Sequence, residues 1–573
     1  MVTGSSGSPS LLAEACAASA PAGGAQPPSA LAGRSPPLPV SVREARRAAS
    51  AVGLFGLPQR RTACQVGWED PQIIDWAVTP VCPRKCSCDL AHSSVHCFRV
   101  GEVPKEIASS IHRIHITHSK IKKLQIADVH RMSVLEEFIL TCSGTESVET
   151  NTFKTLDALR TLELWKNKLR RIPTSLPGNL EVLKLGNNLI SVLHESDFEG
   201  LRKLRVLDIQ SNLVITLSFS TFSVLSSLQS LTLDGNNMES VSRPFHLPNL
   251  KYLSMENNKL QSFSGSFFTF FHNLLFLNLN GNLLTNIPDL PNSLLSLKLN
   301  RNQLKMLKFE DMKQLANLSE LCLSENQLSS VDGMQFLSSL TRLELSGNKL
   351  QIIPIGLPAT LQKIDCSNNL IEIIKVQEFQ DLQGLKHLFL DNNMVTTFED
   401  GALEKCTLLS NLALEKNQLT SIPLRLPHTL ARLDLKGNSI RRIEEQELTN
   451  LMHLQVLNLR NNKISTLNYS LLKYLPRLRY LYLDGNPWNC TCDLLRTRRV
   501  LMAKGTDVKG GQCSSPAESQ GESWMSSKRI LHLCVHNSAY SVEEGKEIGK
   551  KTNADDLSNP RVNMDDYYDY EID

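Results

Sequence analysis

An eleven-residue pattern, L-x-x-L-x-L-x-x-N-x-L, recurs along most of the chain and limits its fold more than any other feature. Two early copies have Ser119 and Ser143 at the ninth position, and fifteen later copies have asparagine there. The mean period between positions 119 and 486 is close to 23 residues. The asparagines are Asn167, Asn188, Asn212, Asn236, Asn258, Asn282, Asn302, Asn326, Asn348, Asn369, Asn393, Asn417, Asn438, Asn462 and Asn486. Such a period predicts stacked repeats instead of separate globular domains.

The spacing of the leucines predicts one short strand in each repeat. In one copy, Leu159, Leu162 and Leu164 are expected to point inward. One repeat cannot bury this apolar face alone, so neighbouring repeats must stack into a continuous core. The asparagine amide can satisfy backbone groups of the turn that leaves the strand. The pattern is that of a leucine-rich repeat, and it predicts an α/β solenoid with a curved parallel sheet of about 17 repeats.

Four of the shorter repeats contain Ile-Pro followed by Leu-Pro. They lie at residues 172–177, 287–291, 353–358 and 422–427. Proline fixes φ and favours extended backbone in the residue before it. The backs of these repeats are therefore expected to be extended, whereas longer repeats such as residues 191–207 have room for a helical turn.

Two groups of four cysteines flank the repeats. The first group is Cys82, Cys86, Cys88 and Cys97, and the second is Cys490, Cys492, Cys513 and Cys534. The ends of a solenoid need covering, because they expose apolar core and unpaired backbone groups. The clusters predict either disulfide-bonded caps in an oxidising compartment or two zinc sites. The intervening gaps of three and one residues differ from the two-residue gap usual at zinc sites, which favours disulfides and no metal.

Composition divides the chain into five segments. Residues 1–81 are rich in Ala, Ser, Pro and Arg and are expected to be disordered. An N-terminal cap at 82–110, repeats at 111–486 and a C-terminal cap at 487–536 follow. Residues 537–573 are polar, end in an acidic run and are expected to be disordered.

The first segment does not look like a secretory leader. It lacks a charged region, an apolar core and a small-residue cleavage site in the usual order. Its Arg-rich, acid-poor start superficially fits an organelle transit peptide. We favour an alternative or mis-assigned first exon, because the cysteine caps argue for export.

Several function classes are excluded by what the sequence lacks. The formal net charge is only +3, which indicates no nucleic-acid partner. No stretch approaches the roughly 18 consecutive apolar residues of a membrane span. The chain has no metalloprotease, serine hydrolase, phosphate-loop or dinucleotide motif. We therefore expect neither catalysis nor a cofactor.

The alternation of short and long repeats, with Cys-x3-Cys-x-Cys-x8-Cys ahead of them, resembles the small leucine-rich repeat proteoglycan family. The resemblance covers residues 82–573. It implies the disulfides Cys82–Cys88, Cys86–Cys97, Cys490–Cys513 and Cys492–Cys534. It also implies a secreted protein of the extracellular matrix that binds a protein ligand on its concave face. Growth factors of the transforming growth factor beta class, sequestered so that their signalling is restrained, are the ligands that it favours.

Two alternatives to sequestration stay open. The protein could be a structural matrix component that regulates collagen fibril assembly. The four-cysteine pattern of the second cluster is similar to the caps of Toll-like and Slit-type repeat proteins, which favours a soluble receptor-like module as the second alternative.

The concave face supplies candidate binding residues. Aromatic side chains on a polar face are the usual anchors of protein interfaces. On this basis we select Trp165, Tyr252, Phe276 and Phe389 as ligand-binding residues. The alternative is that they only shield the sheet, or that two chains pair as a homodimer through this face. His387 is interpreted as a solvated side chain, not a metal ligand.

Further residues are candidates for modification or for the core. Asn317 and Asn468 lie in N-glycosylation triplets. Tyr567, Tyr568 and Tyr570 lie among acidic residues, the surroundings of sulfated tyrosines. Cys366 falls on an inward position and is predicted to be core, whereas Cys322 is predicted to be exposed on the concave face.

Overall fold

The computed structural model describes residues 82–535 except 90, 242 and 265. The N-terminal segment 1–81 and the tail 537–573 lie outside the described residues, and so do Tyr567, Tyr568 and Tyr570. The described chain divides into two compact units. Unit 1 contains the residues up to Asn237 together with Phe245–Leu247, and unit 2 contains Met238–Pro244 and the residues from Pro248 onward. The repeat pattern continues through this region and did not predict the division.

Unit 1 is built on strands that each belong to one repeat, after an initial hairpin. Strand β1 pairs antiparallel with β2, and each later pair from β2 to β10 is parallel. The strands are β1 (Cys86–Asp89), β2 (Ser94–Phe98), β3 (Arg113–Thr117), β5 (Glu137–Thr141), β7 (Thr161–Glu163), β8 (Val182–Lys184), β9 (Val206–Asp208) and β10 (Ser230–Thr232).

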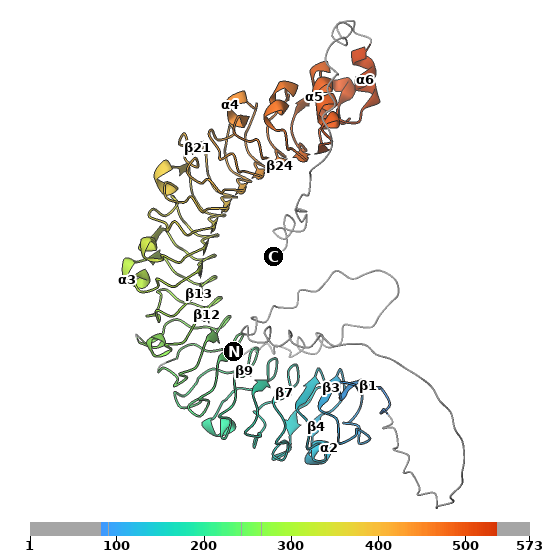
Figure 1. Cartoon of the computed structure of the whole chain (residues 1–573), viewed down its shortest axis with the longest axis vertical. Helices are drawn as coiled ribbons and strands as arrows, with labels where there is room; N and C mark the ends of the chain where they lie inside the picture. Colours follow the sequence, from blue (N-terminus) through green and yellow to red (C-terminus); the bar gives the residue numbers. More distant parts are fainter. Residues whose placement is uncertain (1–81, 90, 242, 265, 536–573) are drawn as a thin grey trace, which may run out of the picture. The chain divides into compact units, whose positions relative to one another are not determined.

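Unit 2 continues the same design with parallel pairs from β11 to β27. Its strands are β11 (Tyr252–Ser254), β12 (Phe276–Asn278), β13 (Ser296–Lys298), β15 (Glu320–Cys322), β17 (Arg342–Glu344), β18 (Lys363–Asp365), β20 (His387–Phe389), β22 (Asn411–Ala413), β23 (Arg432–Asp434), β24 (Val456–Asn458), β25 (Tyr480–Tyr482) and β27 (Asp507–Lys509). Within this unit the strands lie along the inner side of a curved ribbon (Figure 1). The predicted leucine-rich repeat solenoid with a parallel sheet is confirmed.

The leucines and the repeated asparagine form the interior. Leu162 and the corresponding leucines of the other strands are almost fully buried, and each of the fifteen asparagines is at most 9% exposed. The Nδ2 group of Asn188 donates to the carbonyls of Leu164, Leu185 and Gly186 at 2.9, 2.9 and 3.3 Å. Its Oδ1 accepts from the Leu169 amide at 3.0 Å. One buried amide therefore ties two repeats together, as the pattern predicts.

The backs of the repeats follow the proline prediction. The four segments with Ile-Pro and Leu-Pro contain no helix, and residues 191–207 contain the short helix η1 (Glu195–Phe198). In Figure 1, helices α3 and α4 lie on the side of unit 2 opposite to its strands. The back elements of unit 1 are β4 (Lys123–Leu124), α2 (Ile126–Val129), β6 (Ser147–Val148) and η1. Those of unit 2 are η2 (Phe268–Phe270), β14 (Met306–Leu307), α3 (Phe309–Met312), β16 (Ser330–Val331), η3 (Met334–Phe336), β19 (Ile373–Ile374), η4 (Val376–Glu378), β21 (Thr397–Phe398), α4 (Glu445–Leu448) and η5 (Tyr469–Tyr474).

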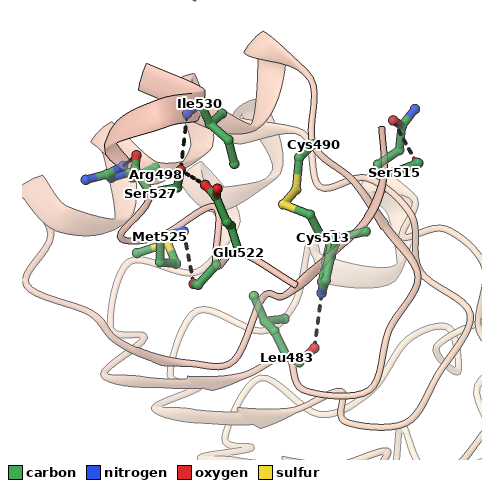
Figure 2. The surroundings of a disulfide bond; sticks show 12 residues. Leu483, Cys490, Arg498, Cys513, Ser515, Glu522, Met525, Ser527 and Ile530 are labelled. Carbon is green, nitrogen blue, oxygen red and sulfur yellow. Dashed lines mark hydrogen bonds between the residues drawn. A yellow bond between two sulfur atoms is a disulfide. The ribbon is translucent and has the colours of Figure 1, made fainter. Parts of the chain in front are cut away.

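Disulfides close both caps. The bonds are Cys82–Cys88, Cys86–Cys97, Cys490–Cys513 and Cys492–Cys534, the pairs that the family resemblance implies. The predicted disulfide-bonded caps are thus confirmed, and these sulfurs are not available as zinc ligands. Figure 2 shows the Cys490–Cys513 bond beside Glu522 and Ser527.

The C-terminal cap adds helices and a small second sheet to unit 2. Its elements are β26 (Trp488–Asn489), α5 (Cys492–Ala503), β28 (Cys513–Ser515), η6 (Ala517–Ser519) and α6 (Lys528–Val535). Trp488 and Trp524 are fully buried, with ring centroids 5.8 Å apart. Gly511 has a φ of 85°, and a Cβ there would come within 2.8 Å of the Trp524 ring nitrogen. The close approach of backbone and indole therefore requires glycine at this position.

Candidate protein-binding face

Two of the four predicted binding residues lie side by side in unit 2. Tyr252 in β11 and Phe276 in β12 are opposite each other in a parallel pair. Phe276 is 41% exposed, whereas Leu277 beside it in the same strand is buried. The two rings therefore stand on the sheet face, where a partner could contact both.

Phe389 lies on the same sheet in β20 and has different neighbours. The rings of Phe389 and His387 are parallel, with centroids 6.5 Å apart. The Lys363 ammonium group lies 5.5 Å from the Phe389 ring centroid. Several strands separate this group from Tyr252 and Phe276, so the three residues do not form one contact cluster.

Trp165, the fourth selected residue, belongs to unit 1, where it follows β7. Its ring is half-buried and has the Lys166 ammonium group 5.0 Å from its centroid. The structure brings together only one pair of the four selected aromatics. Their role as ligand-binding residues stays a prediction.

Unit 2 contains a groove that the sequence did not single out. Its volume is about 1420 Å³, and its lining runs from Thr341 to Tyr482 over the strands β17 to β25. Seven Lys or Arg residues and four Asp or Glu residues line it, together with the half-buried rings of His387, Phe389 and Tyr482. A wide surface with mixed charges and a few rings is typical of protein interfaces.

Ion pairs between neighbouring strands organise the charges of the groove. Lys363 lies 3.5 Å from Glu344, and Lys436 lies 3.0 Å from Glu415. Arg460 lies 2.9 Å from Asp484, and its guanidinium group is 4.4 Å from the Tyr482 ring centroid. These partly exposed pairs hold long side chains over the sheet and contribute little stability each.

Carboxylates at the base of the groove are partly removed from water. Burial raises the pKa of Asp391 to about 7, with a further contribution from the charges of Asp434, Glu415 and Asp365. Asp391 Oδ1 accepts a hydrogen bond from the Glu415 amide at 2.6 Å, which opposes this rise. Burial also raises the pKa of Asp365. The protonation of Asp391 therefore changes near neutral pH.

The pKa of the His387 imidazole shifts in the opposite direction, downward. Burial lowers its pKa, and the positive charges of Lys363, Lys386 and Arg432 act in the same direction. His387 is half-buried on the sheet face, and its interpretation as a solvated side chain stays a prediction. Among residues 82–535, apart from the three gaps, no group of three His, Cys, Asp or Glu residues could hold a metal ion.

Arg432, Lys436 and Arg460 are groove residues that sequence reasoning missed. They occupy positions beside inward leucines in two successive repeats. The sequence shows charged residues at equivalent positions of neighbouring repeats, but only aromatic residues were selected as binding candidates. Which part of a long face forms a groove depends on side-chain lengths in neighbouring strands, and a single repeat does not reveal it.

The prediction for Cys322 was wrong, whereas the one for Cys366 is confirmed. Cys322 lies on the sheet face but is only 2% exposed. Lys298 and Glu344 flank it in the adjacent strands, and burial raises the pKa of its thiol. Cys366 is completely buried, as expected of a core position.

The two glycosylation triplets lie at the surface of unit 2. Asn317 is exposed, and its Nδ2 donates to the Asn292 carbonyl at 3.0 Å. Asn468 is exposed and precedes η5, where its Oδ1 accepts from the Ser470 amide at 3.0 Å. Glycosylation of both residues stays a prediction. In the part of the chain that the structure describes, no helix is long and apolar enough to cross a membrane.

Comparisons with known proteins agree with the repeat architecture. The family model described as leucine rich repeat matches residues 178–238, 359–419 and 428–487. Human podocan-like protein 1 is 27% identical over 421 residues, 67% of this chain and 82% of that protein. A chain in the solved Toll–Spatzle complex from Drosophila has a TM-score of 0.60 at 21% identity, covering 76% of this chain and 64% of that one, which is a likeness of fold.

Mouse nephrocan is much more similar. It is 60% identical over 467 residues, which cover 81% of this chain and 91% of nephrocan. Podocan of mouse is 26% identical over 397 residues, 67% of this chain and 57% of podocan. On these similarities, and on the repeats and disulfide-bonded caps described above, the chain belongs to the small leucine-rich repeat proteoglycan family, in the group of nephrocan.

Proposed function

We propose that this protein is a secreted extracellular glycoprotein that binds a protein ligand on the sheet face of unit 2. The observation that carries the proposal is the groove between Thr341 and Tyr482, with its volume of about 1420 Å³. It is an open surface of charged residues and half-buried rings, unlike the enclosed apolar pocket of a small-molecule site. Tyr252 and Phe276 extend the interface on the same sheet.

Export from the cell is supported by the caps. Four disulfides hold the two ends of the repeats, and such bonds persist in oxidising compartments. The exposed Asn317 and Asn468 lie in acceptor triplets, as expected for a glycoprotein of the extracellular matrix.

The ligand class is proposed from membership of the family. Growth factors of the transforming growth factor beta class are the favoured ligands, and holding them would restrain their signalling without any reaction. Basic groups outnumber acidic ones in the groove by seven to four, so the matching surface of the ligand should be acidic. Collagen binding and a soluble receptor-like role are the alternatives.

Variants of matched exposed phenylalanines test the binding face. Phe276 in β12 is 41% exposed, and Phe270 in η2, on the back of the repeat, is 56% exposed. Binding of the purified protein to immobilised transforming growth factor beta is measured by surface plasmon resonance. We expect Phe276→Ala and Phe389→Ala each to weaken binding about tenfold, as truncation of an interface anchor does. Phe270→Ala should leave the affinity unchanged.

Other outcomes separate the alternatives. Equal losses in Phe270→Ala and Phe276→Ala would contradict binding through the sheet face. Capture of collagen fibrils but not of the growth factor would favour the structural role. The mass in solution distinguishes a homodimer, because pairing through the sheet face would compete with ligand and would weaken in Phe276→Ala.

A further inference from the structure

Unit 1 has a second charged surface, which lies outside the sheet face. It consists of exposed residues that follow the sheet strands in repeats one and three of the solenoid, up to the start of the back strand β4. We name it the basic edge, and its members are Lys120, Lys122, Lys123, Lys168, Arg170 and Arg171.

Backbone contacts place the two halves of the basic edge on either side of one intervening repeat. The intervening repeat contributes residues 144–147, and its Glu146 amide donates to the Lys122 carbonyl at 2.8 Å. The Lys168 amide donates to the Thr145 carbonyl, also at 2.8 Å. The halves are therefore separated by one repeat, which corresponds to roughly 10 Å between two non-adjacent parallel strands.

The charges of the basic edge are not neutralised within the described part of the chain. None of the six side chains lies within ion-pair distance of a carboxylate there. Glu102 and Glu146 are the acidic residues at the corresponding positions of the adjoining repeats. Six basic groups against two acids give a local excess of positive charge that exceeds the +3 of the whole chain.

The chemistry of the basic edge fits a polyanion. Its three repeats have no aromatic residue at the positions that form the edge, so the surface lacks the usual anchor of a protein interface. Arginine forks bind oxyanions with two parallel hydrogen bonds, and flexible lysines act as point charges. Two rows of such groups suit a ligand that presents sulfates at regular intervals along an extended chain.

We propose that the basic edge binds a sulfated glycosaminoglycan chain. The bound polysaccharide lies across repeats one to three of unit 1, with its sulfates between the two rows of basic side chains. This inference does not depend on the proposed function, because it uses different residues in a different unit.

A pair of arginines in unit 2 gives a matched control. Arg441 and Arg442 occupy the same repeat positions as Arg170 and Arg171 and are also exposed. Arg442 lies 2.7 Å from Glu444, and no basic residues occupy the corresponding positions of the two preceding repeats. Both double substitutions to serine remove the same net charge from the same repeat positions.

The experiment measures binding of the full chain to heparin at physiological salt. We expect wild-type binding that weakens as salt rises, because the contacts are ionic. Arg170→Ser with Arg171→Ser should weaken it about tenfold or more, and Arg441→Ser with Arg442→Ser less than about twofold. The triple Lys120→Ser, Lys122→Ser, Lys123→Ser variant should repeat the loss, and desulfated heparin should not bind.

Three results would overturn the proposal. The first is absence of wild-type binding to heparin. The second is an equal loss in the two arginine variants, which would indicate an effect of net charge alone. The third is wild-type affinity in the triple lysine variant, provided that circular dichroism shows it folded. Binding of an acidic protein at the basic edge without binding of heparin would assign the surface to a different class of partner.

Discussion

Units 1 and 2 use the same repeat but close their ends differently. In unit 1 the disulfides span sequence separations of 6 and 11 residues, and the hairpin strand β2 pairs with β3 over five residues. In unit 2 they span 23 and 42 residues and hold the helices α5 and α6. The first cap extends the sheet, whereas the second cap is a small helical cover that disulfide bonds hold in place. The second cap should therefore depend more on its disulfides.

The largest expected effect tests this difference directly. A disulfide removes more entropy from the unfolded chain when it closes a longer loop. Cys492–Cys534, with a separation of 42 residues, should therefore stabilise the fold by about 3.9 kcal/mol, and Cys82–Cys88, with a separation of 6, by about 2.2 kcal/mol. We expect Cys492→Ser with Cys534→Ser to lower the free energy of unfolding more than Cys82→Ser with Cys88→Ser does. Urea unfolding followed by circular dichroism measures both. Equal losses would mean that the helical cap holds itself in place.

The repeated polar residue is serine in the first two repeats of unit 1 and asparagine in its later repeats and in those of unit 2. Asn393 in unit 2 donates to the Leu390 and Cys366 carbonyls at 3.0 and 2.9 Å and accepts from the Ile371 amide at 3.1 Å. Ser143 in unit 1 donates to the Thr141 carbonyl at 2.9 Å. The serine repeats have the five-residue strands β3 and β5, whereas the asparagine repeats have strands of three residues.

Substitution to alanine should distinguish these two positions. Asn393→Ala leaves several buried backbone groups without a partner and should cost about 3 kcal/mol, whereas Ser143→Ala should cost about 1 kcal/mol. Urea unfolding of the two variants checks the ratio. If both cost the same, hydrogen bonding by the asparagine is not what distinguishes the asparagine repeats from the serine repeats.

The fold was predictable because each inference concerned a position that recurs. Leu162 and Asn188 have counterparts in every later repeat, so their burial follows from the period alone. The extended backs follow from proline geometry within one repeat. The cysteine pairing depended on the resemblance, because spacing alone allows three pairings in each cluster.

The candidate site was less predictable because it depends on differences between repeats. Cys322 was expected to be exposed, but it is only 2% exposed between Lys298 and Glu344 of the flanking strands. Tyr252 and Phe276 could be placed together only when the strand register was known. The groove around Asp391 is formed by several strands at once, so no single motif predicts it.

The smallest expected effect compares buried carboxylates of the two units across pH. Burial raises the pKa of Asp391 in unit 2 to about 7, and nearby carboxylates add to the rise. Burial also raises the pKa of Asp208 in unit 1, but hydrogen bonds from Gln210 and the charge of the Lys184 ammonium group oppose this rise. A raised carboxyl pKa means that the folded state keeps a proton which the unfolded state releases above its ordinary pKa of 3.8. Stability should therefore fall as the pH rises toward 7, and change little above it.

Replacement of each carboxylate isolates its contribution. Between about pH 5 and pH 7 the free energy of unfolding of the wild type should fall by about 2 kcal/mol more than that of Asp391→Asn, because asparagine does not titrate. The size of this difference is limited because Asp391 is not fully buried. Asp208→Asn should reduce the pH dependence less. Urea unfolding at both pH values gives the comparison. Parallel curves for the wild type and Asp391→Asn would mean that Asp391 is ionised throughout this range, and the base of the groove would then keep a full negative charge when ligand arrives.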